Sequence, residues 1–271
     1  MAIMNHTLKP IFKWVGGKRW LIPALDKIWR PYNDRKLVEP FTGGMAVALG
    51  LSPKYALLND INPHLINLYN QVKKGLILNY RFKNNEAYFY NKRKRFNQLI
   101  ESSQYKNQEA AAIFFYLIKT GFNGLCRFNN DGKFNVPFGQ HKSINYDIDL
   151  DPYHKQFGDW QFNSKDFAKI KLTGDEFLYV DPPYDVEFTK YHKKDFNFAD
   201  QIRLAEWLKN HKGPIIASNQ ATPRIIELYE DFGFSVKTLY APRRVSCNGD
   251  RRPALEILAF KGIPKNIISR I

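Results

Sequence analysis

The stretch that most constrains the fold covers residues 177–184 and consists of Phe-Leu-Tyr-Val-Asp-Pro-Pro-Tyr. Four consecutive apolar or aromatic residues predict a short buried strand. Pro182 and Pro183 end this strand, because proline cannot donate to a sheet ladder. In an open α/β sheet, ligands bind beyond the carboxyl ends of the strands. The sequence therefore predicts a rigid crevice bordered by the Asp181 carboxylate, the Pro182 carbonyl and the Tyr184 ring.

These three groups suit one kind of ligand. A carboxylate and a carbonyl are both acceptors, so together they fit an amino group that carries two N–H bonds. An aromatic ring beside them fits a flat heterocycle. A planar base with an exocyclic amine satisfies all three groups. A plain strand-ending turn is the alternative, because such a tetrapeptide also arises by chance.

The charge of the chain points to a polyanionic partner. The 271 residues carry a net charge of +15, and nucleic acid is the default partner of so basic a protein. An aromatic content of 15% favours nucleic acid over the alternative, a merely basic soluble protein, because bases stack on rings. Between Lys73 and Lys142 there are 13 Lys and Arg against four Asp and Glu, so most of the excess charge lies there.

Several classes of protein are not expected. Cys126 and Cys247 show neither a disulfide framework nor a metal-binding spacing, and the histidines lack such a spacing too. We therefore expect no protein-bound metal. No apolar run approaches the length of about 18 residues needed for a membrane span, and no signal peptide is evident. We expect a protein of the reducing cytoplasm.

Two strand-turn-helix units precede the central strand. In the first, a short strand ends at Glu39 and runs through Phe41 into a turn at Gly43, before a helix at 45–51. The second strand ends at Asp60, about 20 residues beyond the first, where an acid binds ribose hydroxyls in dinucleotide-type folds. The alternative for Asp60 is an N-cap of the helix at 64–72.

Further elements follow from apolar spacing. Asp166 and Phe167 come after a candidate strand and could bind a nucleoside, the acid at an adenine amino group and the ring at its face. Residues 146–159 are acidic and predicted as a loop. Thr222 is a candidate N-cap. The remaining elements are expected as helices at 19–29, 110–118, 198–209 and 222–232, and as strands at 160–162, 214–219, 234–240 and 255–260.

A hairpin is predicted in the basic region. Asp131 and Gly132 are a strong turn signal between two short aromatic runs. A two-stranded ribbon fits the major groove, where Arg can bind guanine and Asn can bind adenine. An ordinary loop is the alternative. The candidate base readers are Arg127, Asn123 and Asn129, with Phe122 as a wedge between base steps.

Five motifs then stand in a specific order. They are Lys-Trp-Val-Gly-Gly-Lys at 13–18, Glu-Pro-Phe-Thr-Gly-Gly at 39–44, Asn-Asp-Ile-Asn at 59–62, Asn-Gly-Leu-Cys-Arg at 123–127 with Gly-Lys-Phe-Asn-Val-Pro-Phe-Gly at 132–139, and Asp-Pro-Pro-Tyr at 181–184. In this order the chain resembles the Dam-type (alpha-class) DNA adenine methyltransferases, which use S-adenosylmethionine. The similarity runs from Phe12 to about Lys261.

The resemblance implies an α/β fold: a Rossmann-like methyltransferase with a mixed seven-stranded sheet and an inserted small helical and β-hairpin target-recognition domain. The catalytic, cofactor-binding domain would cover 1–62 and 158–271, and the recognition domain 63–157. It implies methyl transfer to the 6-amino group of adenine in double-stranded DNA, with base flipping, in GATC. It also implies a DNA-associated protein in the cytoplasm of a bacterial or phage-infected cell, and the protein is expected to be a monomer in solution.

The resemblance also implies roles for single residues. His141 departs from the aromatic residue of some relatives, so contacts to outer bases can differ. The catalytic residues would be Asp181, Pro182 and Tyr184. Cofactor contacts would be Trp14, Lys18, Glu39, Phe41, Gly43, Asp60, Asp166, Phe167 and Asp181. DNA contacts would be Lys13, Phe122, Asn123, Leu125, Arg127, Asn129, Asn135 and Pro137, with Arg243 and Arg244 on phosphates.

Two alternatives remain open. The same crevice could methylate the 4-amino group of cytosine or a base in RNA. A protein of another class, a catalytically silent DNA-binding regulator, could keep the hairpin without turnover; the intact Asp-Pro-Pro-Tyr motif argues against it.

Overall fold

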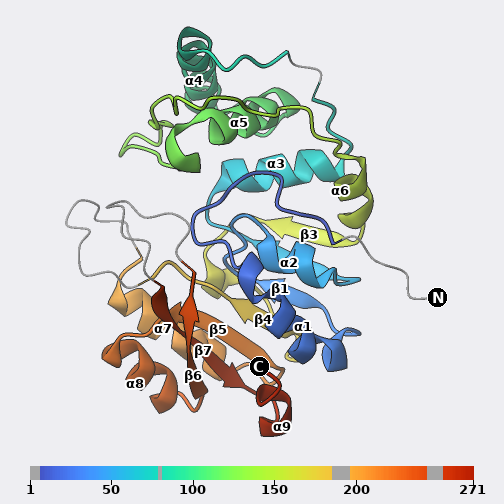
Figure 1. Cartoon of the computed structure of the whole chain (residues 1–271), viewed down its shortest axis with the longest axis vertical. Helices are drawn as coiled ribbons and strands as arrows, with labels where there is room; N and C mark the ends of the chain where they lie inside the picture. The colour runs from blue at the N-terminus through green and yellow to red at the C-terminus, as the bar shows by residue number, and fades with distance from the viewer. Residues whose placement is uncertain (1–6, 79–80, 185–195, 243–252) are drawn as a thin grey trace. The chain divides into compact units, whose positions relative to one another are not determined.

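The structure is a computed structural model that describes residues 7–78, 81–184, 196–242 and 253–271 (Figure 1). Its α-helices are α1 (Ile22–Trp29), α2 (Ala46–Leu51), α3 (Pro63–Lys73), α4 (Glu86–Glu101), α5 (Gln108–Thr120), α6 (Asp151–Gln156), α7 (Phe198–Lys209), α8 (Pro223–Asp231) and α9 (Lys265–Ile268). Its 3-10 helices are η1 (Arg19–Leu21), η2 (Arg30–Tyr32), η3 (Phe122–Gly124) and η4 (Phe167–Lys169). Its strands are β1 (Leu37–Glu39), β2 (Ala56–Asn59), β3 (Trp160–Asn163), β4 (Phe177–Val180), β5 (Ile215–Gln220), β6 (Ser235–Ala241) and β7 (Ala254–Lys261).

The strands form one mixed sheet in the order β3-β2-β1-β4-β5-β7-β6. β1 is parallel to both β2 and β4, and β4 is parallel to β5. β7 is antiparallel to both β5 and β6. The chain order reverses on either side of β1 and β4, so their carboxyl ends border the crevice where ligands bind in such sheets. The α/β fold with a mixed seven-stranded sheet is confirmed.

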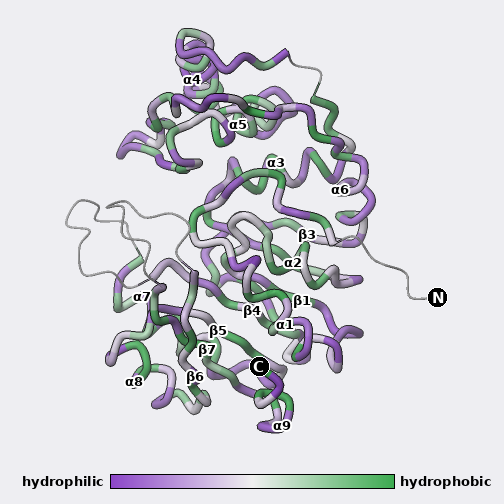
Figure 2. Tube along the Cα trace, viewed as in Figure 1, coloured by the Kyte–Doolittle hydropathy of each residue, from purple (hydrophilic) through white to green (hydrophobic). Residues whose placement is uncertain are grey.

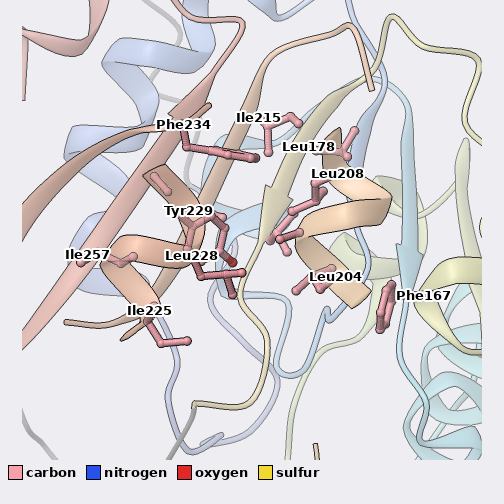
Figure 3. Close-up of a cluster of buried hydrophobic side chains, with 14 of the residues drawn as sticks. Phe167, Leu178, Leu204, Leu208, Ile215, Ile225, Leu228, Tyr229, Phe234 and Ile257 are labelled. Atoms are coloured by element: carbon pink, nitrogen blue, oxygen red, sulfur yellow. The ribbon is translucent and has the colours of Figure 1, made fainter. Parts of the chain in front are cut away.

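Alternation along β4 explains why it is buried on both faces. Successive residues of a strand point to opposite faces. Phe177 packs its ring edge-on against Trp29 of α1, with centroids 5.1 Å apart. Leu178 belongs instead to a cluster with Leu204 and Leu208 of α7 and with α8 (Figure 3). All four residues of β4 are buried, as the apolar run predicts.

The chain divides into two compact units. The first unit comprises Met1–Gly17, Gly43–Ser52 and Asn62–Ser164; the second comprises Lys18–Thr42, Pro53–Ile61 and Lys165–Ile271. In the first unit, α5 packs on both α3 and α4. Figure 2 shows the hydrophobic colour along α5 and a largely hydrophilic α4, in keeping with an α5 that is buried along most of its length.

Some local expectations change. Residues 151–156 form α6, although the acidic segment around them predicts a loop; Tyr153 provides its buried contact. Thr222 is the N-cap residue of α8, but its hydroxyl makes no capping bond. Asn62, not Asp60, caps α3, because its side chain accepts from the backbone N–H groups of His64 and Leu65.

The predicted hairpin is present but stops short of regular strands. Phe128 and Phe134 form an antiparallel bridge, and so do Gly121 and Phe138. The turn lies at Asn129, whose side chain accepts the N–H groups of Asp131 and Lys133 at 3.1 and 2.8 Å. Among the described residues, every helix is too short or too polar to span a bilayer.

Candidate active site

The carboxylate of Asp181 is fixed at the carboxyl end of β4. Lys18 Nζ lies 2.9 Å from each of its two oxygens. Ser218 of β5 donates its hydroxyl to Oδ1 at 2.8 Å. Lys18 is only 4% exposed, and a buried charge is stable only when it is paired and hydrogen-bonded. The sequence places Asp181 at this point, and the structure adds the two groups that hold it.

Ser218 has a hydroxyl partner of its own. Ser218 is fully buried, and the hydroxyl of Tyr179 lies 3.1 Å from the hydroxyl of Ser218. Burial raises the pKa of Tyr179 well above its usual value, and the nearby Asp181 carboxylate adds to the shift. The phenol therefore stays protonated and can hydrogen-bond to Ser218. No motif in the sequence marks Ser218; the alternation of β5 beside β4 is the signal that could find it.

The two prolines differ in what their carbonyls contact. Gln201 of α7 donates to the Pro183 carbonyl at 2.9 Å, and Asn219 in turn donates to Gln201 at 3.0 Å. No described residue donates a hydrogen bond to the Pro182 carbonyl. The backbone after β4 is therefore held at Pro183, while the Pro182 carbonyl keeps its capacity to accept.

Tyr184 completes this group. The Lys18 ammonium lies 4.9 Å from the centroid of its ring. Burial raises the pKa of Tyr184 far above its usual value, with further contributions from the carboxylates of Asp181 and Glu256. The ring is thus a neutral face beside Asp181, as a stacking role requires.

In the second unit, the buried side chain of Asn59 connects two of the segments that carry predicted cofactor residues. Asn59, 1% exposed, donates to the carbonyls of Pro40 and Lys165, both at 2.9 Å, and accepts from the Lys165 N–H at 3.2 Å. It therefore joins the segment after β1 to the segment before Asp166. Asp60 follows it with a half-buried side chain. Asn59 is part of a recognised motif, yet the sequence does not reveal this tying role.

Glu39 is buried at the end of β1, where Thr42 donates to its carboxylate at 3.3 Å. Arg203 of α7 forks onto Asp166 at 2.8 and 3.0 Å. This pairing lowers the pKa of the Asp166 carboxyl, so the acid stays ionised. Asp166 also accepts from the Ala168 N–H at the start of η4.

The two aromatic candidates differ in access. Phe167 is 3% exposed and belongs to the buried cluster of Figure 3. Phe41 is half-buried and lies 5.5 Å from Phe167 and 5.5 Å, edge-on, from Phe196. Phe41 is the more accessible of the two rings, with Phe167 packed behind it.

In the first unit, Trp14 lies against the glycine turn. A Cβ at Gly43 would come within 2.7 Å of Trp14 Nε1, and one at Gly44 within 2.7 Å of the Trp14 side chain. Gly43 also has a positive φ of 45°. Tyr69 donates to the Gly43 carbonyl at 2.6 Å. The close approach of an indole to this backbone explains why two glycines stand here.

The hairpin at 121–139, which is predicted to recognise DNA, presents its candidate side chains outward. Phe122 is 48% exposed, and Asn123 adopts a positive φ of 52°. The guanidinium of Arg127 donates to the Asn135 side chain at 2.8 Å and to its carbonyl at 3.3 Å. Arg127 and Asn135 are therefore one coupled pair, with Asn129 holding the turn.

The other predicted DNA contacts of the first unit lie at or beside this hairpin. A Cβ at Gly124 would come within 3.3 Å of the Lys13 carbonyl, so Lys13 lies next to it. Leu125 is half-buried, and Lys13 and Pro137 are exposed. His141 lies 3.2 Å from the Gly121 carbonyl. Arg243, Arg244 and Cys247 lie outside the described residues.

The family model that matches residues 14–241 is that of the D12 class N6 adenine-specific DNA methyltransferases. The chain belongs to this family. It is 34% identical to a DNA adenine methylase of Haemophilus influenzae over 279 residues, which cover 95% of each protein. It is 35% identical to a DNA N-6-adenine-methyltransferase of Escherichia phage P1 over 263 residues, which cover 90% of this chain and 34% of the phage protein. A solved tRNA (m1A58) methyltransferase of Aquifex aeolicus matches with a TM-score of 0.40 and 10% identity, over 92% of this chain and 72% of that one.

The family implies S-adenosylmethionine as the methyl donor, and the residues present fit that molecule. Asp60 offers a half-buried carboxylate beyond β2, where acids of such folds bind ribose hydroxyls. Glu39, the last residue of β1, and Asp181, just beyond β4, add carboxylates, which suit ammonium and sulfonium charges. Among the described residues, no cluster of His, Cys, Asp or Glu could hold a metal ion.

Proposed function

We propose that this chain methylates the 6-amino group of adenine in double-stranded DNA, within GATC, after flipping the base out of the helix. The observation that carries the proposal is the Asp181 carboxylate, pinned by Lys18 and Ser218 and followed by a carbonyl, on Pro182, that no described residue uses. Family membership supports the N6 amino group of adenine in DNA as the target.

The carboxylate retains capacity for one more donor. It offers about four lone-pair sites, and Lys18 and Ser218 approach three of them. The remaining site can accept one N–H of the adenine amine, and the Pro182 carbonyl can accept the other. With both hydrogens engaged, the nitrogen lone pair turns away from conjugation with the ring and becomes available for attack.

The protein's contribution is positioning and charge complementarity. When bound, S-adenosylmethionine supplies an electrophilic methyl group on a positively charged sulfur. Asp181 stabilises the positive charge that develops on the amine nitrogen, and Lys18 keeps the carboxylate in place. Tyr184 holds the plane of the base. Because the target amine is paired inside the duplex, the base must leave the stack first.

The hairpin supports sequence reading. Arg127, Asn123 and Leu125 are the proposed GATC readers, because Arg matches guanine, Asn matches adenine and an apolar side chain matches the thymine methyl group. Exposed Phe122 is the proposed wedge, and exposed Lys13 is a proposed DNA contact at the recognition site. Asn129 is a further candidate base reader, Asn135 is a further proposed DNA contact, and Arg243 and Arg244 are proposed contacts to DNA phosphates. We assign residues 63–157 as the target-recognition domain and 1–62 with 158–271 as the catalytic domain.

The decisive experiment is methyl incorporation across a randomised duplex library, with the product nucleoside identified by mass spectrometry. N6-methyladenine confined to GATC supports the proposal. N4-methylcytosine, or transfer to RNA alone, favours the alternative substrates that an acceptor pair also fits. Sequence-specific DNA binding without any transfer would identify a silent regulator.

A further inference from the structure

Helix α4 carries a row of polar side chains that bond to the hairpin. Arg93, Asn97 and Glu101 are spaced four residues apart, so they lie along one face of the helix. Arg93 donates to the Val136 carbonyl at 3.0 Å, and Glu101 pairs with Lys133 at 2.6 Å. All of these residues belong to the first unit.

Asn97, in the middle of the row, makes the most specific contact. Its side chain accepts the Phe134 N–H at 2.8 Å and donates to the Phe134 carbonyl at 3.2 Å. A primary amide thus satisfies both main-chain groups of one residue, as a neighbouring strand would. Asn97 therefore stands in for a third strand at the edge of the hairpin.

Alternation along the hairpin explains this arrangement. The N–H of Asn135 bonds inward, to the Arg127 carbonyl at 3.1 Å. The groups of the preceding residue, Phe134, point the other way, and there they meet Asn97. The Phe134 ring is 1% exposed and packs against Phe96 and Phe128, so both the ring and the peptide groups of this residue are fixed.

This fixed point lies next to the proposed base reader. Asn135 follows Phe134 directly, and its side chain and carbonyl hold the Arg127 guanidinium. A shift of the hairpin backbone at Phe134 would therefore move the side-chain oxygen and the carbonyl of Asn135, which orient the Arg127 guanidinium. A misplaced guanidinium still attracts DNA by its charge, but it loses the bidentate geometry that distinguishes guanine from other bases.

We propose that Asn97 is a positioning residue for sequence discrimination, which sets the register of the hairpin through Phe134 without touching a base. This inference rests on the proposed function, in which the hairpin reads DNA. Residues 92–95 of the same helix are a basic Lys-Arg-Lys-Arg run, and two of its side chains make structural contacts. Arg93 holds the hairpin, and Arg95 donates two hydrogen bonds of 2.8 Å to the Glu109 carboxylate of α5.

The test compares Asn97→Ala with Gln98→Ala. Gln98 is the next amide on α4, is exposed, and makes no side-chain hydrogen bond among the described residues. Methyl transfer is measured on the preferred site found in the library and on sites with one base changed. We expect Asn97→Ala to lower the ratio of kcat/KM between preferred and altered sites by about fivefold or more, since one bidentate base contact is worth about 1–3 kcal/mol. Gln98→Ala should keep the ratio.

Two further measurements separate the explanations. The affinity for S-adenosylmethionine should be the same in both variants. Asn97→Asp keeps the acceptor for the Phe134 N–H and should retain more discrimination than Asn97→Ala. The inference is overturned if Asn97→Ala leaves the ratio unchanged, or if it lowers kcat/KM equally on all sites. In both cases the proposed function stands, provided that the wild-type protein discriminates between preferred and altered sites. If the wild-type protein shows neither methyl transfer nor sequence preference, the proposed function itself is wrong.

Discussion

The end of β4 and the predicted recognition hairpin are held in opposite ways. At β4, the functional group is itself the anchored group: Asp181 is bonded to buried Lys18 and Ser218. In the hairpin the anchors grip the main chain, as Asn97 does at Phe134, and Phe122 and Arg127 stay exposed. The first arrangement suits a charge whose position must not vary, and the second suits side chains that must meet a partner.

Under the proposed function, this difference predicts which property each region controls. Substitutions around Asp181 should change the rate of methyl transfer and leave sequence preference alone. Substitutions in the hairpin should change sequence preference and leave the chemical step nearly intact. A variant that changes both the rate of methyl transfer and the sequence preference would contradict this separation of roles.

The largest effect is expected for Asp181→Asn, which keeps the size of the side chain but removes its charge. Methyl transfer should fall by at least about 100-fold, the loss typical of removing one electrostatic contact to a transition state. Single-turnover rates on the preferred duplex measure this loss, and DNA-binding preference should be unchanged. Asp151→Asn is the control, because Asp151 is an exposed carboxylate paired with Lys155 within α6. A wild-type rate in Asp181→Asn would refute the proposed mechanism.

Lowering the pH should reduce the stability of the protein, because the buried side chain of His64 becomes protonated. This side chain is 7% exposed among aromatic rings, including Phe128 of the hairpin, 5.0 Å away and stacked. Burial lowers its pKa from 6.5 to about 4. The unfolded state therefore binds the proton more readily, and stability that is complete above pH 6.5 declines as the pH falls towards about 4. The loss is at most about 3 kcal/mol.

Urea unfolding at a series of pH values measures this decline. His64→Phe should show a flatter profile between pH 6.5 and 4, because the titrating group is absent. The same decline in both proteins would assign it to other groups.

Ser218→Ala should reduce kcat by about tenfold or more, since a hydrogen bond to a charged group contributes about 1.5–3 kcal/mol. Sequence preference and KM for DNA should hold. Tyr179→Phe removes only the outer hydroxyl, 3.1 Å from Ser218, and should have a smaller effect. Equal kcat values for Ser218→Ala and the wild type would mean that Lys18 alone positions Asp181.

Arg127→Ala should cost about 1–3 kcal/mol of specific binding and relax preference at one base. Competition binding with single-base variants of the site measures this change. Lys106→Ala, an exposed cation elsewhere in the first unit, should weaken binding to all sequences slightly or not at all. Uniform weakening by Arg127→Ala would instead assign Arg127 to a phosphate.

Local signals predict much of this molecule. The apolar run of β4 and its two prolines suffice to place Asp181 at the end of a buried strand. The turn signal at Asp131 and Gly132 suffices to predict a hairpin there, but not its register, in which Phe128 bridges Phe134. The short helix α6 is missed, because Tyr153 alone among its six residues is buried and no apolar periodicity results.

The partners of these groups are not readable from local patterns. Lys18 and Asp181 are 163 residues apart, and Ser218 is 37 residues beyond Asp181. Such pairs depend on which strands become neighbours, which only the completed sheet decides. The same holds for Asn97, whose amide would otherwise be taken for an ordinary polar position on a hydrophilic helix.

The most direct test is a structure of the protein with its preferred duplex and an unreactive cofactor analogue, in which the distances from the adenine N6 atom are measured. The proposed mechanism requires the N6 atom to lie within about 2.6–3.2 Å of both an Asp181 carboxylate oxygen and the Pro182 carbonyl oxygen, with the base stacked on the Tyr184 ring. An adenine that remains paired in the duplex, or an N6 atom that reaches neither oxygen, would contradict it.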